Sequence, residues 1–363
     1  MAFRTQSNAA PDAFDAVIAG APANATLAEL DSLIDWAPVR TIFAATYDSS
    51  GRGQAGFDPV VLYKMLLLEE LYALSDVQAS REAGDRISFR RFLGLGVAEA
   101  PPDDTTLVRF RARVRPGALL EKARHEVERR LAAHRLRIQP GSVKVVDATL
   151  VPAATRPPKG TSKTDNTDDT SASSPSPEAP SEPVARASDG PSAAQEAPPR
   201  RSRLDPDARF GGKKGRLRFA YKMHTAIDAA SGVISDFRVT PANVADTSVF
   251  AELLEEQEAA VLADKGYDSA ANRAALAARG ARDGIMRRLF IDPDSLMGRI
   301  EVARNQKLAR LRAPSEGVFA SLKRWRRLPR AIYTGIERVT QQVQIAVTVH
   351  NALKYLTLRQ KCA

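Results

Sequence analysis

The stretch VKVVDATLV, residues 143–151, decides the fold, because its apolar residues read as a strand that carries a single acid, Asp147. A second apolar run, AAVLAD at 259–264, ends in another acid, Asp264. Short runs of β-branched and aliphatic residues are typical of buried strands. The sequence therefore predicts two strands that bring one carboxylate each to the same sheet.

A third acid stands in a different setting. Glu316 lies in RAPSEGVFASLKRW, residues 312–325, which is rich in Arg and Lys and has the spacing of a helix. Carboxylates from three separate elements can hold Mg²⁺, which prefers oxygen ligands, and the basic helix can lie beside a phosphate backbone. These features indicate an enzyme that acts on nucleic acid.

The elements around these acids predict a mixed sheet. Strand-like runs at 218–228 and 233–240 are joined by AASG and read as a hairpin. A helix at 244–258, a helix at 269–280, a strand near 284–286 and helices at 305–325 and 336–356 complete the order. This β-β-β-α-β-α-β-α-α order favours a ribonuclease-H-like α/β fold with helices on both faces. The strand of Asp147 would then be central, with the strand of Asp264 beside it.

The N-terminal part of the chain reads as short helices. Four polar residues are expected to cap helices there, and these are Asp58 (before Pro59), Ser75, Ser88 and Asp104. Many arginines lie among these helices, which fits either a helix-turn-helix module on DNA or a helical bundle with a solvated basic face.

Composition and charge narrow the class of protein. The 363 residues carry a net charge of +10 with a pI near 9.8, so the surface should attract polyanions. Cys362 is the only cysteine and the four His are scattered, which argues against disulfides and against Cys-based or His-rich metal sites. No segment reads as a signal peptide or membrane span, so we expect a cytoplasmic protein without a membrane partner.

The chain is expected to have four parts. Residues 161–203 have almost no large apolar residue and are expected to form a disordered insertion. We expect an N-terminal tail at 1–24, a helical domain at 25–135, and an α/β domain that comprises 136–160 and 204–358.

Three further residues carry structural expectations. Asp246 is expected to cap the helix that follows it, and Trp325 is expected in the core rather than stacked on a displaced base. Pro314 either opens a new helix that begins after Arg312, or lies inside a longer helix that puts Arg312 on the same face as Glu316.

Several motifs in both parts of the chain resemble those of a known protein family. VVDATLV, AYKMHTAID, PANVADTSVF, ADKGYDSAANRAAL and the pattern R-x3-E-x6-K at Arg312, Glu316 and Lys323 are similar to the DDE transposases of bacterial insertion sequences, in the insertion-sequence-four and insertion-sequence-five group. FDPVVLYKMLLLEELYALSD and PPDDTTLVRFRARV resemble the helical domain that precedes the catalytic domain in these enzymes. The Tyr that normally stands three residues before the Arg is Ala309 here.

The resemblance implies roles for these residues. Asp147, Asp264 and Glu316 would be catalytic and would bind two Mg²⁺ ions, with Mn²⁺ as a substitute. The partner would be double-stranded DNA at the element ends and target, bound by a homodimer or larger assembly, with the helices around 58–115 recognising the ends. The implied DNA contacts are Lys222, His224, Arg312, Lys323, Arg324, Arg326, Arg327, Arg90, Arg109 and Arg111.

Two alternatives stay open. A domesticated or inactive transposase would bind DNA without any use for the three acids. A structure-specific ribonuclease-H-like nuclease would keep the acids but would cleave without joining ends.

Overall fold

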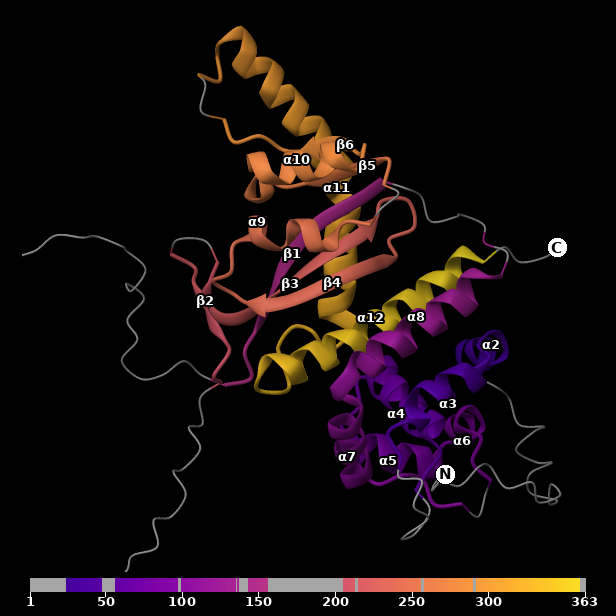
Figure 1. Cartoon of the computed structure of the whole chain (residues 1–363). Coiled ribbons are helices and arrows are strands. Elements are labelled where there is room, and N and C mark those ends of the chain that lie inside the picture. The colour runs from indigo at the N-terminus through magenta and orange to yellow at the C-terminus, as the bar shows by residue number, and fades with distance from the viewer. Residues whose placement is uncertain are drawn as a thin grey trace, which may run out of the picture.

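The computed structural model describes residues 24–47, 56–96, 99–134, 136, 143–155, 205–212, 215–255, 258–289 and 292–359. The expected insertion at 161–203 and the expected tail, apart from Asn24, lie outside these residues. A helical region and a sheet with its helices lie side by side, and α12 runs between them (Figure 1).

The helical region surrounds α4, whose sequence PVVLYKMLLLEELY is buried along almost its whole length. Tyr63 of α4 packs with Phe43 and lies fully buried, and Phe43 in turn packs against Phe110 with ring centroids 5.5 Å apart. The elements are α2 (Ala25–Leu33), α3 (Trp36–Ala44), α4 (Pro59–Tyr72), α5 (Asp76–Asp85), α6 (Ile87–Leu93), α7 (Asp104–Val114), η1 (Pro116–Ala118) and α8 (Leu119–Ala132).

Two of the four expected helix caps are confirmed. Asp58 caps α4, and Ser75 caps α5 in a capping box with Gln78. The other two predictions were wrong by one or two residues. Arg86 occupies the cap of α6 in place of Ser88, and Asp103 caps α7 by accepting from Thr106 N at 2.7 Å, because Asp104 already lies in the first turn.

The sheet has the predicted mixed character. Its strands are β1 (Val143–Pro152), β2 (Arg209–Gly211), β3 (Arg218–Asp228), β4 (Ile234–Pro241), β5 (Ala260–Ala263) and β6 (Arg282–Ile285). The order is β2-β3-β1-β5-β6, and β4 pairs with β3. β1 is antiparallel to β3 and parallel to β5, so the predicted central place of β1 next to β5 is confirmed.

Helices cover both faces of the sheet. They are α9 (Asp246–Val249), η2 (Phe250–Leu253), η3 (Lys265–Tyr267), α10 (Ala270–Ala278), α11 (Leu296–Trp325) and α12 (Ile336–Leu358). Successive residues of β1 point to opposite faces. Val145 therefore packs with Val318 and Val343 of α11 and α12, while Val146 packs with Phe250 and Leu276 on the other face. The helix expected at 244–258 is shorter and partly 3₁₀.

α12 contributes to two cores. Val343 and Val347 belong to the core under the sheet, whereas Ile345 and Val349 belong to the core of the helical region. The fold class is thus confirmed as a helical region followed by a ribonuclease-H-like mixed sheet. Within the described part of the chain, no helix is both long and apolar enough to cross a membrane.

Candidate active site

Asp147 lies on β1 and faces α11. Its Oδ2 accepts hydrogen bonds from Arg312 Nη2 and from Ser315 Oγ, both at 2.9 Å, and its Oδ1 lies 2.9 Å from the N–H of Ala148. Thr225 on β3 donates to the backbone carbonyl of Asp147 at 3.1 Å. The side chain is 18% exposed, so the carboxylate is held firmly yet still reaches solvent.

Asp264 comes directly after β5. The register pairs Ala263 of β5 with Val146 of β1, so Asp264 follows at the level of Asp147 on the neighbouring strand. Its Oδ1 accepts from the N–H of Lys265 at 2.8 Å, which caps η3. The side chain is 45% exposed. The predicted meeting of two strand acids at one sheet edge is therefore what the fold provides.

Arg312 links the two acids. One guanidinium nitrogen lies 2.9 Å from Asp147 Oδ2 and the other lies 3.7 Å from Asp264 Oδ1. The arginine side chain is 14% exposed. Two negative groups that converge on one cation form a site where positive charge is favoured.

Pro314 lies inside α11, which continues as one helix from Leu296 to Trp325. Of the two arrangements left open by the sequence, the structure has the longer helix, with Arg312 one turn before Glu316. Glu316 directly follows Ser315, whose hydroxyl binds Asp147, but its own side chain is exposed. Among the described residues, no three or more His, Cys, Asp or Glu are grouped so as to hold a metal ion.

Lys222 and His224 lie on the opposite face of the sheet from Asp147. In the β1–β3 register they face Leu150 and Ala148, positions that alternate with Asp147. The ring of His224 is fully buried, with Nε2 3.0 Å from Thr240 Oγ1, and burial lowers its pKa to about 4, so it is neutral.

Asp246 holds the Lys222 ammonium at 2.9 Å. The expectation that Asp246 caps its own helix was wrong, because α9 begins at Asp246 itself, its cap residue is Ala245, and no side chain caps it. The carboxylate turns instead toward β3. Lys222 and Asp246 therefore form an ion pair on the face of the sheet that α9 covers.

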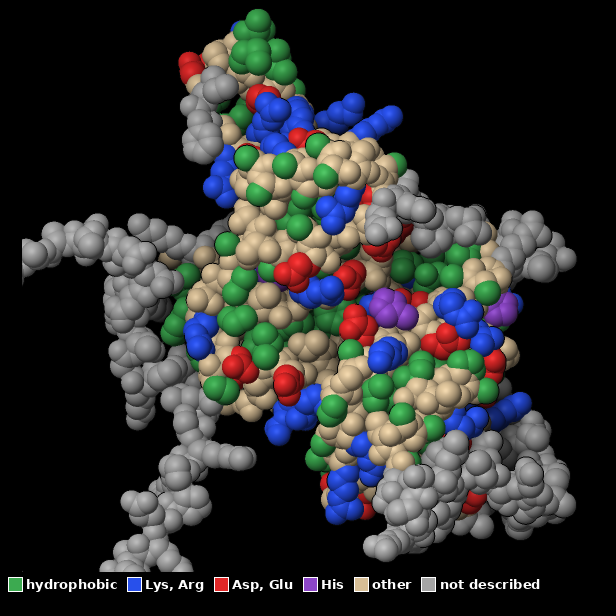
Figure 2. All heavy atoms as spheres, in the orientation of Figure 1, with side chains coloured by type: hydrophobic (Ala, Val, Ile, Leu, Met, Phe, Trp, Pro, Cys, Tyr) green, Lys and Arg blue, Asp and Glu red, His purple; other side chains and the backbone are tan. Residues whose placement is uncertain are grey.

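The C-terminal end of α11 presents a basic surface. Lys323 and Arg324 are exposed, and the Arg324 guanidinium lies 4.9 Å from the centre of the Trp325 ring. Trp325 is 57% exposed, so the expectation of a core tryptophan was wrong. Partial burial, followed by the charge of Arg218, lowers the pKa of Lys323. Figure 2 shows a further gathering of Lys and Arg over α10 and the neighbouring part of α11.

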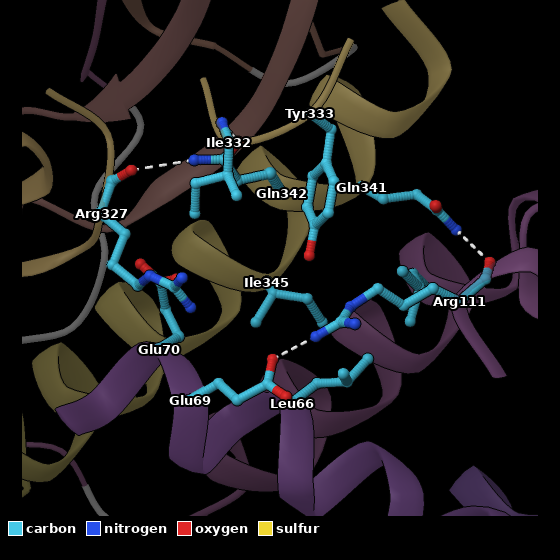
Figure 3. A pocket seen from close by; sticks show the side chains of 11 residues that line it. Leu66, Glu69, Glu70, Arg111, Arg327, Ile332, Tyr333, Gln341, Gln342 and Ile345 are labelled. Carbon is cyan, nitrogen blue, oxygen red and sulfur yellow. Dashed lines mark hydrogen bonds and ion pairs between the residues drawn. The ribbon is translucent and has the colours of Figure 1, made fainter. Parts of the chain in front are cut away.

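Other arginines are engaged at the junction of the two regions. Arg111 is ion-paired with Glu69 and with Asp76, the latter at 2.7 Å. Figure 3 shows it across a small cavity from Arg327 and Glu70. Glu69 and Glu70 are each 4% exposed, and burial raises the pKa of both carboxyls, that of Glu70 to about 8.

Arg326 is part of this junction and donates to the backbone carbonyl of Glu70 at 3.3 Å. Arg90 is only 7% exposed and donates to the carbonyls of Gly96 and Glu99. Of the three arginines expected to contact DNA from the helical region, Arg109 is the exposed one.

Sequence reasoning missed two residues near the acids and one ion pair on the other face of the sheet. Ser315 binds Asp147, and its place three residues after Arg312 on a helix was the available signal. Tyr267 is buried, has no hydrogen-bond partner for its hydroxyl in the described structure, and has its pKa raised well above the usual value by burial and then by nearby acids, first Asp246. The Asp246–Lys222 pair had no signal in either local sequence.

Family models and a known transposase match the chain. Residues 138–352 match the family model described as "Transposase DDE domain", and residues 17–113 match that described as "Transposase domain (DUF772)". A transposase for insertion sequence element IS1106 from Neisseria meningitidis serogroup B is 28% identical over 302 residues, which cover 77% of this chain and 95% of that protein. No solved structure matches the chain. The chain belongs to the DDE transposase domain family.

Proposed function

We propose that this chain is the transposase of an insertion sequence in the insertion-sequence-four and insertion-sequence-five group. It binds the terminal inverted repeats of its element, hydrolyses DNA strands there, and joins the freed 3′-hydroxyl to target DNA. The observation that carries this proposal is the convergence of Asp147 and Asp264 on one cationic group beside α11, in a chain of the DDE family.

The two acids beside Arg312, Asp147 and Asp264, fit a divalent cation in their chemistry. Mg²⁺ prefers carboxylate oxygens, and the Arg312 guanidinium between Asp147 and Asp264 indicates that positive charge is favoured between them. Asp147, Asp264 and Glu316 would hold two Mg²⁺ ions, or Mn²⁺ in their place. These ions would supply Lewis acidity and would lower the pKa of a bound water.

The remaining side chains have separate tasks. Arg312 lies beside the acids and is placed to meet a phosphate once the acids hold metal ions. Lys323, Arg324 and Arg109 are exposed and contact phosphates of the bound duplex. Arg326 and Arg327 lie at the junction with the helical region, where Arg326 donates to the backbone carbonyl of Glu70. Lys222 and His224 support the site from the other face of the sheet, because their side chains are largely or fully buried.

Domain roles follow the same division. The helical domain at 25–135 recognises the element ends, and the parts at 136–160 and 204–358 form the catalytic domain. Because transposition must pair two DNA ends, the active assembly is a homodimer or larger.

The test is strand cleavage and joining on a labelled duplex that carries the element end, with Mg²⁺ or with EDTA. We expect nicking at the repeat boundary followed by joined product with Mg²⁺ only, and loss of both with Glu316→Gln. The matched control is Glu337→Gln, an exposed glutamate on α12 that should leave both steps unchanged.

Two results would contradict the proposal. Tight binding of the end without cleavage would indicate an inactive, DNA-binding descendant of a transposase. Cleavage without joining, and without preference for the repeat, would indicate a structure-specific nuclease.

A further inference from the structure

Asp246 forms an ion pair on the face of the sheet opposite α11. Its Oδ1 accepts from the Lys222 ammonium at 2.9 Å, and the same ammonium donates to the carbonyl of Val244 at 2.7 Å. The side chain of Lys222 is 16% exposed and that of Asp246 is 29% exposed. The pair therefore ties the middle of β3 to the segment that enters α9.

The other oxygen of Asp246 packs against the turn that presents Asp264. A Cβ placed on Gly266 would lie only 3.1 Å from Asp246 Oδ2, which is closer than ordinary contact, so the backbone of the turn passes directly over the carboxylate. Gly266 is the middle residue of η3, and the cap of η3 is Asp264. The Asp246 carboxylate therefore lies against the turn that holds Asp264.

The surroundings leave Asp246 one cationic partner among the described residues. His224 Nδ1 lies 3.8 Å from Asp246 Oδ1, but burial lowers the pKa of His224 to about 4 and keeps the ring neutral. Tyr267, the last residue of η3, is buried and packs on Phe250 with ring centroids 5.7 Å apart. The turn is consequently held between an ion pair and an aromatic contact.

We propose that Asp246 is a positioning residue of the active site, which together with Lys222 fixes the turn at 264–267 so that Asp264 is presented to the metal ions beside Asp147. This inference rests on the proposed function, because it presumes that Asp264 holds metal. In this role Asp246 acts through the turn rather than by holding a metal ion itself. Residues that support metal ligands change metal affinity or activity by about 10–100-fold when they are substituted.

The experiment compares Asp246→Asn with Asp236→Asn in the full chain. Asp236 is a matched control, because its carboxylate also accepts from a cation, Arg238 at 2.8 Å, on the neighbouring strand β4. Mn²⁺ binding is measured by calorimetry without DNA, and cleavage is measured as a function of Mg²⁺. For Asp246→Asn we expect the half-saturating metal concentration to rise about 10-fold, with the KM for DNA unchanged. The control should keep wild-type values.

A second variant guards against misfolding of the first. Gly266→Ala leaves the ion pair intact but places a methyl group against Asp246 Oδ2, so it should weaken metal binding in the same way. Because both substitutions act through one turn, their combined effect should be smaller than the product of the two.

Three outcomes would overturn the inference. They are wild-type Mn²⁺ affinity in both Asp246→Asn and Gly266→Ala, an equal loss in Asp236→Asn, and effects that multiply in the combined variant. Failure of the proposed function is distinguishable from these. A wild-type chain that binds Mn²⁺ but does not cleave element ends would overturn that function, while the calorimetric comparison would still decide the role of Asp246.

Discussion

Two clusters in this molecule pair acids with arginine, and they differ in their access to solvent. At the sheet edge, Arg312 lies between Asp147 and Asp264, whose side chains are 18% and 45% exposed. At the junction with the helical region, Arg111 and Arg327 lie near Glu69 and Glu70, which are each 4% exposed. The residue types are nearly the same in both clusters.

The difference teaches that exposure, rather than composition, separates a candidate active site from a structural contact. Acids that reach solvent can exchange an arginine for a metal ion and a phosphate. Buried acids instead join two parts of the fold. The edge cluster should therefore govern activity, and the junction cluster should govern stability.

The largest expected effect is on catalysis at the edge cluster. Asp147→Asn or Asp264→Asn should lower strand cleavage by about 1,000-fold or more, because several kcal/mol of transition-state stabilisation by metal is lost. The thermal unfolding midpoint should change little. Cleavage rates and calorimetric unfolding of the same samples check both parts. An unchanged cleavage rate would contradict the conclusion that the edge cluster governs activity.

Breaking the junction cluster should have the opposite result. Arg111→Met leaves Glu69 buried without its cationic partner, so the free energy of unfolding should fall by about 3–5 kcal/mol. Urea unfolding measures this, and Arg109→Met, at an exposed position on the same helix, is the control expected to cost about 0.5 kcal/mol or less. A comparable fall in the free energy of unfolding of both variants would show that the ion pair of Arg111 with Glu69 does not stabilise the junction.

The pH dependence of stability sharpens the comparison further. Burial raises the pKa of Glu70 to about 8, above its value of 4.5 in the unfolded chain. At pH values between these two, Glu70 is protonated in the folded state but ionised in the unfolded chain. The contribution of Glu70 to the free energy of unfolding therefore falls as pH rises from about 4.5 to about 8. Over that window the free energy of unfolding of the wild type should fall by about 2–4 kcal/mol because of Glu70. Glu70→Gln should not show this fall.

Unfolding free energies of the wild type and Glu70→Gln, measured at pH 5 and pH 9, test this prediction. The two proteins should differ more at pH 9. Glu337→Gln, on the exposed side of α12, should follow the wild type at both values. Parallel pH profiles for Glu70→Gln and the wild type would contradict the assignment of Glu70 as a buried, protonated acid.

The smallest effects concern single phosphate contacts. Lys323→Ala and Arg324→Ala should each reduce the slope of log affinity against log salt concentration by about 0.9 for duplex DNA. Arg129→Ala on α8, whose arginine is already paired with Glu126, should leave the slope unchanged. Fluorescence anisotropy at several salt concentrations provides the measurement. Equal slopes in all variants would place the DNA elsewhere on the surface.

Much of the fold could be predicted because its signals are local. The apolar runs that precede Asp147 and Asp264 predicted adjacent strands, and the register of β1 with β5 agrees. The order of strands and helices was sufficient for the fold class. The caps at Asp58 and Ser75 followed from their own side chains.

The rest depended on contacts between distant segments. Lys222 and His224 share a face because they are two residues apart, but only the pairing of β3 with β1 puts that face opposite Asp147. Arg109 and Arg111 are two residues apart on α7, and the position of α4 decides that only Arg111 becomes buried. Trp325 is exposed at the end of α11, which its aromatic character could not indicate.

The place of α12 in the chain has a consequence for how the protein is made. Residues 336–358 come after every other helix and strand described here, yet they complete both the core under the sheet and the core of the helical region. During synthesis the earlier segments can form helices and strand pairs, but neither core can close until α12 has left the ribosome. A chain that stalls before residue 336 therefore exposes apolar surface of both regions at once.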